Sequence, residues 1–239
     1  MESNSLERLL RHPREKVWQT IFDPGAAEHW LGTVASVMPE REGAALCWIY
    51  DPGARMPTTY SGRIQVLDRF RRLELVIGLV ACDAEIRMTF ELTDVPTESG
   101  DTHTRLKLQQ DGFPADGNGR FERDGFLHHW DHFLELLGDY LDGTPKNYHT
   151  MHKTELGVIP VGAIRGEGML VQDVAVGAPA DLAGVRAGDV IRSCGDFVFG
   201  SLDDLDAWVE SHRPGERVEL LVGDRLVPVV LRAKQYTPS

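Results

Sequence analysis

Histidines are the residues of this chain whose spacing most readily suggests chemistry. His128 and His132 are four residues apart in a predicted helix, so both rings could hold one metal ion from the same face. His149 and His152 form a second close pair. Neither pair is accompanied by a carboxylate or thiolate at the spacing of a familiar metal site. We therefore predict no metal site and no cofactor.

Covalent catalysis would need an activated nucleophile, and the sequence offers no recognisable one. It contains no G-x-S-x-G turn, and no serine has identifiable histidine and acid partners. Cys47, Cys82 and Cys194 are far apart and lack C-x-x-C spacing, which predicts reduced thiols. No catalytic residue is therefore assigned, and the sequence favours a protein that is not an enzyme.

The charge balance restricts the classes of partner. The 239 residues include 37 acidic and 25 basic ones, a net charge of -12, which disfavours a nucleic-acid or polybasic membrane surface. No stretch approaches the roughly 20 apolar residues of a membrane-spanning helix, and the opening residues lack a signal-peptide core. We expect no nucleic-acid partner, no membrane span and a cytoplasmic location.

Two periodic regions position these residues. Residues 1–142 and 156–235 each show strand and helix patterns, whereas residues 143–155 contain turn formers without an apolar period. The sequence thus predicts two domains joined by a linker at 143–155.

The first region has the pattern of a meandering antiparallel sheet with two helices. Apolar and polar residues alternate from Ala84 to Thr93, which is typical of a half-buried strand. Rougher patterns predict further strands at 45–50, 60–68, 73–77 and 102–110. One helix is predicted from Pro13 to a stop at Asp23-Pro24-Gly25, and a longer one from about 118 to 141. Its apolar stripe must be buried against the sheet, so the predicted fold is α+β with a helix gripped by a curved sheet.

Several short motifs in the first region occur in the order found in a known superfamily. Val17-Trp18, Asp23-Pro24 and Trp30 are followed by Gly62-Arg63-Ile64 and Asp111-Gly112-Phe113. This series resembles the SRPBCC or START-like superfamily with its helix-grip fold, and in particular the branch related to the activator of the heat-shock protein 90 ATPase. The resemblance implies a cavity between the sheet and the long helix.

The side chains expected around that cavity are mostly large and apolar. They are Trp30, Trp48, Tyr50, Tyr60, Arg63, Met88, Phe90, Phe113, Phe126 and Trp130. An open helix grip lined in this way would suit a hydrophobic small molecule. Simple core packing of the same residues is the alternative. Polar groups near the cavity, namely His29, Asp51, Tyr60 and Arg63, would serve a cyclase-like enzyme.

The second region carries a more specific series of motifs. Leu156-Gly157-Val158 is followed by Gly168-Met169-Leu170-Val171, by Ala178-Pro179-Ala180 with Ala183-Gly184-Val185, and by Gly188-Asp189-Val190-Ile191. This series resembles the PDZ domain of bacterial HtrA-like proteases, a small β-barrel-like domain with two helices. The protease domain itself has no counterpart in residues 1–142. Proteolysis is therefore not expected.

The PDZ resemblance implies capture of the C-terminal tail of a protein partner, added as a strand to a sheet edge. By position, the loop Glu155-Leu156-Gly157-Val158 would receive the carboxylate and Ile159 to Val161 would be the docking edge. The second helix would supply the opposite wall. The predicted peptide-binding residues are Leu156, Gly157, Val158, Ile159, Val161, Leu202, Asp206 and Val209. Leu202 stands where a related subtype has histidine, which predicts an apolar ligand residue two positions before the terminus.

Together these patterns predict a non-enzymatic adaptor with two binding domains. The first would hold a hydrophobic small molecule or dock a protein, and the second would capture a C-terminal tail. Two alternatives remain open, a co-chaperone-like regulator of a heat-shock protein 90 type ATPase and a cyclase-like enzyme that uses the helix-grip cavity.

Overall fold

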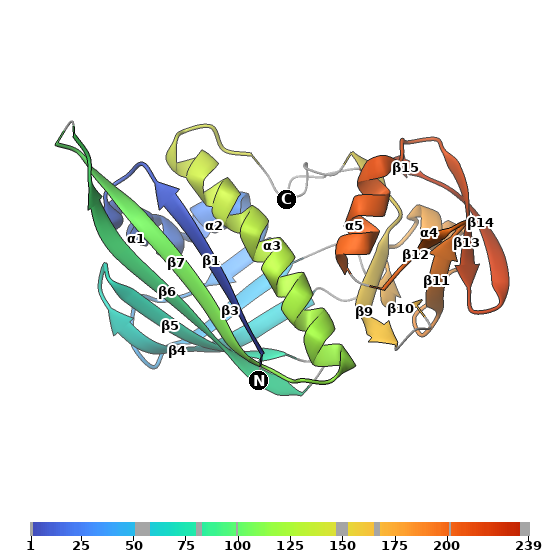
Figure 1. Ribbon diagram of the computed structural model, residues 1–239, viewed down its shortest axis with the longest axis horizontal. Coiled ribbons are helices and arrows are strands. Elements are labelled where there is room, and N and C mark those ends of the chain that lie inside the picture. Colours follow the sequence, from blue (N-terminus) through green and yellow to red (C-terminus); the bar gives the residue numbers. More distant parts are fainter. Residues whose placement is uncertain are drawn as a thin grey trace. The chain divides into compact units, whose positions relative to one another are not determined.

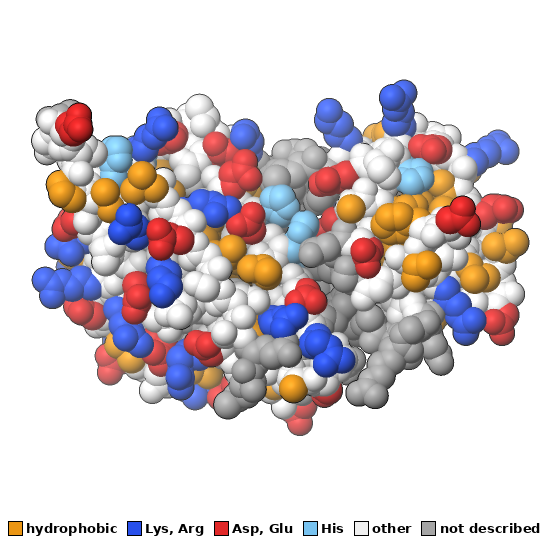
Figure 2. Space-filling view, in the orientation of Figure 1, with side chains coloured by type: hydrophobic (Ala, Val, Ile, Leu, Met, Phe, Trp, Pro, Cys, Tyr) orange, Lys and Arg blue, Asp and Glu red, His pale blue; other side chains and the backbone are white. Residues whose placement is uncertain are grey.

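The computed structural model describes residues 2–50, 58–79, 83–98, 100–146, 153–164, 168–200 and 202–234. It divides into two compact units. Among the described residues, 2–50, 58–114 with its gaps, and 127–146 belong to the first unit, and 115–126 and 153–234 with its gaps to the second. On the face shown in Figure 2, acidic and basic side chains are interspersed over both units.

The first unit is a seven-stranded antiparallel sheet with helices (Figure 1). Its elements are β1 (Glu2–Leu10), α1 (Arg14–Phe22), α2 (Pro24–Trp30), β2 (Ala35–Val37), β3 (Ala45–Tyr50), β4 (Thr58–Asp68), β5 (Arg72–Leu79), β6 (Ala84–Pro96), β7 (Thr102–Phe113) and, from Leu127 onward, α3 (Gly117–Leu141). The strand order is β1-β7-β6-β5-β4-β3-β2. Apart from β1, the sheet is a meander, as the sequence predicts.

Alternation along the strands builds the core of this unit. Ile86, Met88, Phe90 and Leu92 of β6 are all buried, while Glu85 and Arg87 are not. The buried stripe of α3, which includes Trp130, Phe133 and Leu137, completes the core. The predicted helix-grip arrangement is therefore confirmed.

Strand β1 is absent from the sequence prediction. It pairs with β7 along its whole length, and its inward positions Asn4, Leu6, Arg8 and Leu10 alternate with exposed ones. Two of these four are polar, so the apolar period is hidden. Asn4 Nδ2 donates a hydrogen bond to Gln110 Oε1 at 3.1 Å, and Arg8 pairs with Asp131 of α3. These partners make polar inward positions tolerable.

The first helix stops where the sequence predicts, but a second helix that was not predicted follows it at once. Helix α1 does end at Phe22, but α2 begins directly at Pro24. The Asp23 side chain accepts a hydrogen bond from the Gly25 N–H, so it acts as the N-cap of the second helix. Proline fits this first helical position, because it has no N–H to leave unsatisfied. The new helix brings Trp30 into the core.

The second unit is a small sheet domain with two helices. Its elements are β8 (Thr154–Glu155), β9 (Val158–Ile164), β10 (Gly168–Val174), α4 (Pro179–Leu182), β11 (Val190–Cys194), β12 (Phe197–Val198), α5 (Leu202–Ser211), β13 (Arg217–Val222), β14 (Arg225–Val230) and β15 (Arg232–Ala233). The main sheet runs β14-β13-β11-β10-β9, with β12 paired to β11, and β15 pairs with β8. Its core is built around Phe199 and Trp208, whose rings are 5.5 Å apart. The two helices that the PDZ resemblance implies are both present, as α4 and α5.

Candidate functional site

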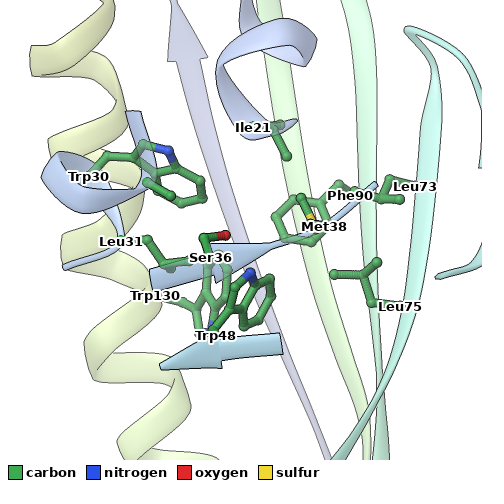
Figure 3. A pocket seen from close by; sticks show the side chains of 11 residues that line it. Ile21, Trp30, Leu31, Ser36, Met38, Trp48, Leu73, Leu75, Phe90 and Trp130 are labelled. Atoms are coloured by element: carbon green, nitrogen blue, oxygen red, sulfur yellow. The ribbon is translucent and has the colours of Figure 1, made fainter. Parts of the chain in front are cut away.

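An aromatic cluster lies where the cavity of the first unit is predicted (Figure 3). The Trp130 ring is 6.2 Å from Trp30 of α2, 5.8 Å from Trp48 of β3 and 5.5 Å from Phe90 of β6, measured between centroids. Ser36 of β2 also lines this site. Four of the ten predicted cavity residues are thus brought together by four different elements.

The space inside this cluster is closed. All four rings are 3% exposed or less, and the space between them has no room for a water molecule. A void of this kind cannot hold an apolar ligand unless the rings separate. In this structure the four aromatic residues pack as core, which is the alternative left open by the sequence.

The other predicted cavity residues lie elsewhere. Met88 and Phe113 are fully buried but are not among the residues that line the closed space. Tyr50 and Tyr60 are half-buried and contact each other edge to face at 5.9 Å. Phe126 is also buried, but it falls within the residues that group with the second unit.

Arg63 lies on the outer face of the sheet. It is exposed and pairs with Glu85 at 3.1 Å, whereas Tyr60, an odd number of positions away on β4, faces the other side. Of the residues proposed for a cyclase-like site, Tyr60 and Arg63 therefore lie on opposite faces of the sheet. His29 contacts the Tyr140 ring at 5.6 Å, and Asp51 lies outside the described residues.

The histidines on α3 are close to one another. The rings of His128 and His132 are 4.7 Å apart. Within the part of the chain that the structure describes, no group of three or more histidine, cysteine or carboxylate side chains could hold a metal ion. His149 and His152 lie outside that part.

The predicted carboxylate loop of the second unit is firmly anchored. The Leu156 side chain is 2% exposed and belongs to the core. The Leu156 carbonyl accepts from the Ala180 N–H at 3.0 Å, and the Gly157 carbonyl accepts from the Ala175 N–H at 2.8 Å. Side chain and carbonyls thus all point into the domain.

Gly157 is the residue that makes this loop possible. Its φ is +79°, a region that side-chain-bearing residues rarely adopt, and an added Cβ would lie 2.2 Å from the Ala178 Cβ. Among the described residues, the N–H groups of Leu156 and Gly157 donate to no backbone carbonyl of a turn or loop. A positive φ such as that of Gly157 is one in which successive N–H groups can converge as an anion nest, and this role of the loop stays a prediction.

Arg232 ties this loop to the end of the chain, and sequence reasoning did not identify it. Its Nε donates to Glu155 Oε2 at 2.8 Å and its Nη1 donates to the Gly177 carbonyl at 2.7 Å. The short β8–β15 pairing brings these residues together across 77 positions. No local pattern in the sequence signals such a contact.

Lys234 adds a positive group near the same loop. Burial lowers its pKa, while the nearby carboxylates of Asp206 and Glu155 act in the opposite direction. Its backbone N–H donates to the Lys153 carbonyl at 3.0 Å. Lys234, Asp206 and Glu155 thus form a group of charged side chains near this loop.

Strand β9 follows the loop and is the last strand of its sheet. Within the described residues, its outer edge has no partner strand. Val158, Ile159 and Pro160 are half-buried, and the side chain of Val161 lies outside the described residues. An edge strand with an unpaired side is where an extended peptide can add.

Helix α5 carries the predicted opposite wall. Val209 is 8% exposed and joins the core with Leu205 and Trp208, while Asp206 is half-buried. The side chain of Leu202 lies outside the described residues. Its predicted contact with a ligand therefore stays a prediction.

Comparison with known proteins agrees with both units. A family model described as Activator of Hsp90 ATPase homolog 1-like protein matches residues 11–142, more than half of the chain. The chain belongs to this family. A PDZ domain model matches residues 147–223. The Activator of Hsp90 ATPase homolog 1-like domain is thus followed by a PDZ domain, as the two sequence resemblances indicated.

Solved structures similar to this chain cover about three fifths of it. Protein MLL2253 from Mesorhizobium loti is 26% identical with a TM-score of 0.51, over 60% of this chain and 98% of its own. Protein CV1439 from Chromobacterium violaceum is 20% identical with a TM-score of 0.48, over 59% and 96%. The product of gene BPP1335 from Bordetella parapertussis is 23% identical with a TM-score of 0.48, over 62% and 79%. No curated protein matches the sequence. A search of the described helices finds none that is long and apolar enough to cross a membrane.

Proposed function

We propose that this chain is a binding protein with two domains, and that its PDZ domain captures the C-terminal tail of a partner protein. The carrying observation is the Leu156-Gly157 bend, whose N–H groups have no backbone acceptor among the described residues. A terminal carboxylate would accept hydrogen bonds from these groups, and the residues before it would extend along the free edge of β9.

The chemistry of the predicted ligand follows from this site. The ligand needs a free carboxylate, because an amide terminus carries no charge for the nest to stabilise. Leu202 predicts an apolar residue two positions before the terminus. These requirements define a class of C-terminal sequence and leave the partner protein unnamed.

A peptide library tests the proposal on the full chain. Peptides with random C-terminal residues are presented once as free acids and once as terminal amides. The proposal predicts selection of free acids only, with an apolar residue at the third position from the end. Equal binding of acids and amides would contradict it.

The first domain is proposed to dock a protein rather than to store a ligand in its resting state. Support comes from the closed aromatic cluster, which has no room for a water molecule. Native mass spectrometry of protein purified from its host tests this point. A co-purifying apolar molecule would contradict it and favour the hydrophobic-ligand hypothesis.

A chaperone-linked role is the second candidate. The observation in its favour is the family match, since that family is described by activation of the Hsp90 ATPase. The family likeness alone does not transfer that activity. Adding the full chain to the host's heat-shock protein 90 ATPase tests it directly. Stimulation of ATP hydrolysis would support this role, and an unchanged rate would exclude it.

A further inference from the structure

The docking edge of the second unit contains a proline, and the direction of its backbone can be worked out. In β9, Val158, Ile159 and Pro160 lie opposite Val174, Asp173 and Val171 of β10. The Val171 N–H donates to the Asp189 carbonyl at 2.8 Å, and its carbonyl accepts from the Gly188 N–H at 2.8 Å. Val171 therefore turns both polar groups away from β9. In an antiparallel pair, two opposite residues direct their backbone polar groups either towards each other or away from each other. Pro160 lies opposite Val171, so its backbone carbonyl is directed to the free edge of β9.

A second observation leads to the same result. The Ala175 N–H donates to the Gly157 carbonyl, so this position of β10 faces the β9 side. Asp173, two residues earlier, has the same orientation along the strand and lies opposite Ile159. The register shift between Asp173 and Val171 is the reason why Val171 faces the other way. Alternation then directs the polar groups of Ile159 inward and those of Val158 and Pro160 outward.

Pro160 has no N–H, so the free edge is incomplete at this point. The edge presents the carbonyls of both Val158 and Pro160 but only the N–H of Val158. A strand docked opposite Pro160 can donate its own N–H to the Pro160 carbonyl. Its carbonyl finds no donor there. The register of β9 against β10 also shifts on both sides of the Val171–Pro160 pair, between Asp173 and Val171 and between Val171 and Met169, so the pairing is irregular at this point.

We propose that Pro160 limits the backbone hydrogen bonds that β9 offers to a docked tail. As a result, the carbonyl of the ligand's third-from-last residue has no donor, and the tail binds this edge weakly. This inference rests on the proposed capture of C-terminal tails. With the carboxylate at the Leu156-Gly157 bend and the strands antiparallel, the last ligand residue lies by Val158. The third-from-last residue then lies by Pro160, because outward positions recur every two residues. The edge thus recognises short tails mainly through their carboxylate and side chains.

The Pro160→Ala variant of the full chain tests this directly. It restores an N–H to the edge, and a free-acid tail chosen from the library should bind about 3- to 10-fold more tightly, the value of one hydrogen bond. Pro160→Val should show the same gain, which separates the N–H from side-chain size. Pro228→Ala is the matched control, because Pro228 lies on β14 at the opposite end of the same sheet. It should leave the affinity unchanged.

A modified ligand confirms which atom is involved. Replacing the second-from-last residue by its hydroxy acid turns the preceding carbonyl into an ester, a weaker acceptor. The natural chain should bind the ester and the amide ligand equally, whereas Pro160→Ala should favour the amide. If the tail binds but Pro160→Ala shows neither gain nor preference, this inference is overturned while tail capture stands. If no free-acid tail binds at all, both fail.

Discussion

Gly157→Ala perturbs the proposed carboxylate loop at the position where the geometry is least tolerant. Alanine at a φ of +79° costs about 1–2 kcal/mol in backbone strain. The new Cβ would also lie 2.2 Å from the Ala178 Cβ, and such overpacking costs about 1–3 kcal/mol more. We expect the second domain to lose about 2–5 kcal/mol of unfolding free energy.

Gly177→Ala provides the matched control for this prediction. Gly177 has a φ of +69°, but an added Cβ would meet nothing within 4 Å. It should therefore show the strain alone, about 1–2 kcal/mol. The double variant Gly157→Ala with Ala178→Gly removes the clashing methyl group and should recover much of the extra loss.

Urea unfolding and tail binding of the full chain are the measurements. Gly157→Ala should weaken binding of a free-acid tail at least 10-fold, since the loop must move away from Ala178 and its N–H groups diverge. Equal losses of stability in Gly157→Ala and Gly177→Ala would refute the packing of the loop against Ala178. Unchanged binding by a folded Gly157→Ala variant would refute its role as the anion site.

Three further predictions concern other parts of the chain. Trp130→Ala should destabilise the first domain by about 3–5 kcal/mol in thermal unfolding and open a space that indole partly refills, whereas a small loss would show that the rings pack loosely. Burial raises the pKa of Glu122 from 4.5 to about 6, so its charged form costs stability. The unfolding free energy should fall by about 2 kcal/mol as pH rises from 4.5 through 6, and Glu122→Gln should abolish that fall; denaturation curves between pH 4 and 8 that are parallel for both proteins would contradict this. Arg232→Ala should cost about 1–3 kcal/mol and weaken tail binding, because Glu155 and the Gly177 carbonyl lose their shared donor, while normal binding in calorimetry would show that the loop holds without it.

Strands with a clean apolar period were predictable from the sequence. The alternation through Ile86, Met88 and Phe90 predicts the strand that the structure shows as β6. Strand β1 escaped notice because Asn4 and Arg8 occupy inward positions and find their partners more than 100 residues away. A local pattern cannot reveal a polar group that is satisfied by so distant a contact.

The candidate sites were predictable only to the level of the loop and the edge. The sequence predicts a carboxylate loop at Leu156-Gly157, and this role stays a prediction. Arg232 contacts Glu155 beside it through a pairing that only the fold creates. Trp30, Trp48 and Trp130 would line either an open cavity or a closed core, so residue type alone could not decide between them. In the structure the Trp130 ring lies 6.2 Å from Trp30 and 5.8 Å from Trp48, an arrangement that only the fold creates. Leu202 and Val161 keep their predicted roles as hypotheses.

The central claim is that the N–H groups of Leu156 and Gly157 receive a chain terminus. Titration of the isotope-labelled full chain with a free-acid tail, followed by amide NMR, observes those two groups directly. We predict large chemical-shift changes for both amides and for the amides of Val158 and Ile159 in β9. The amidated tail should cause no comparable change. Shifts that leave both amides unmoved, or that are the same for the acid and the amide, would contradict the account.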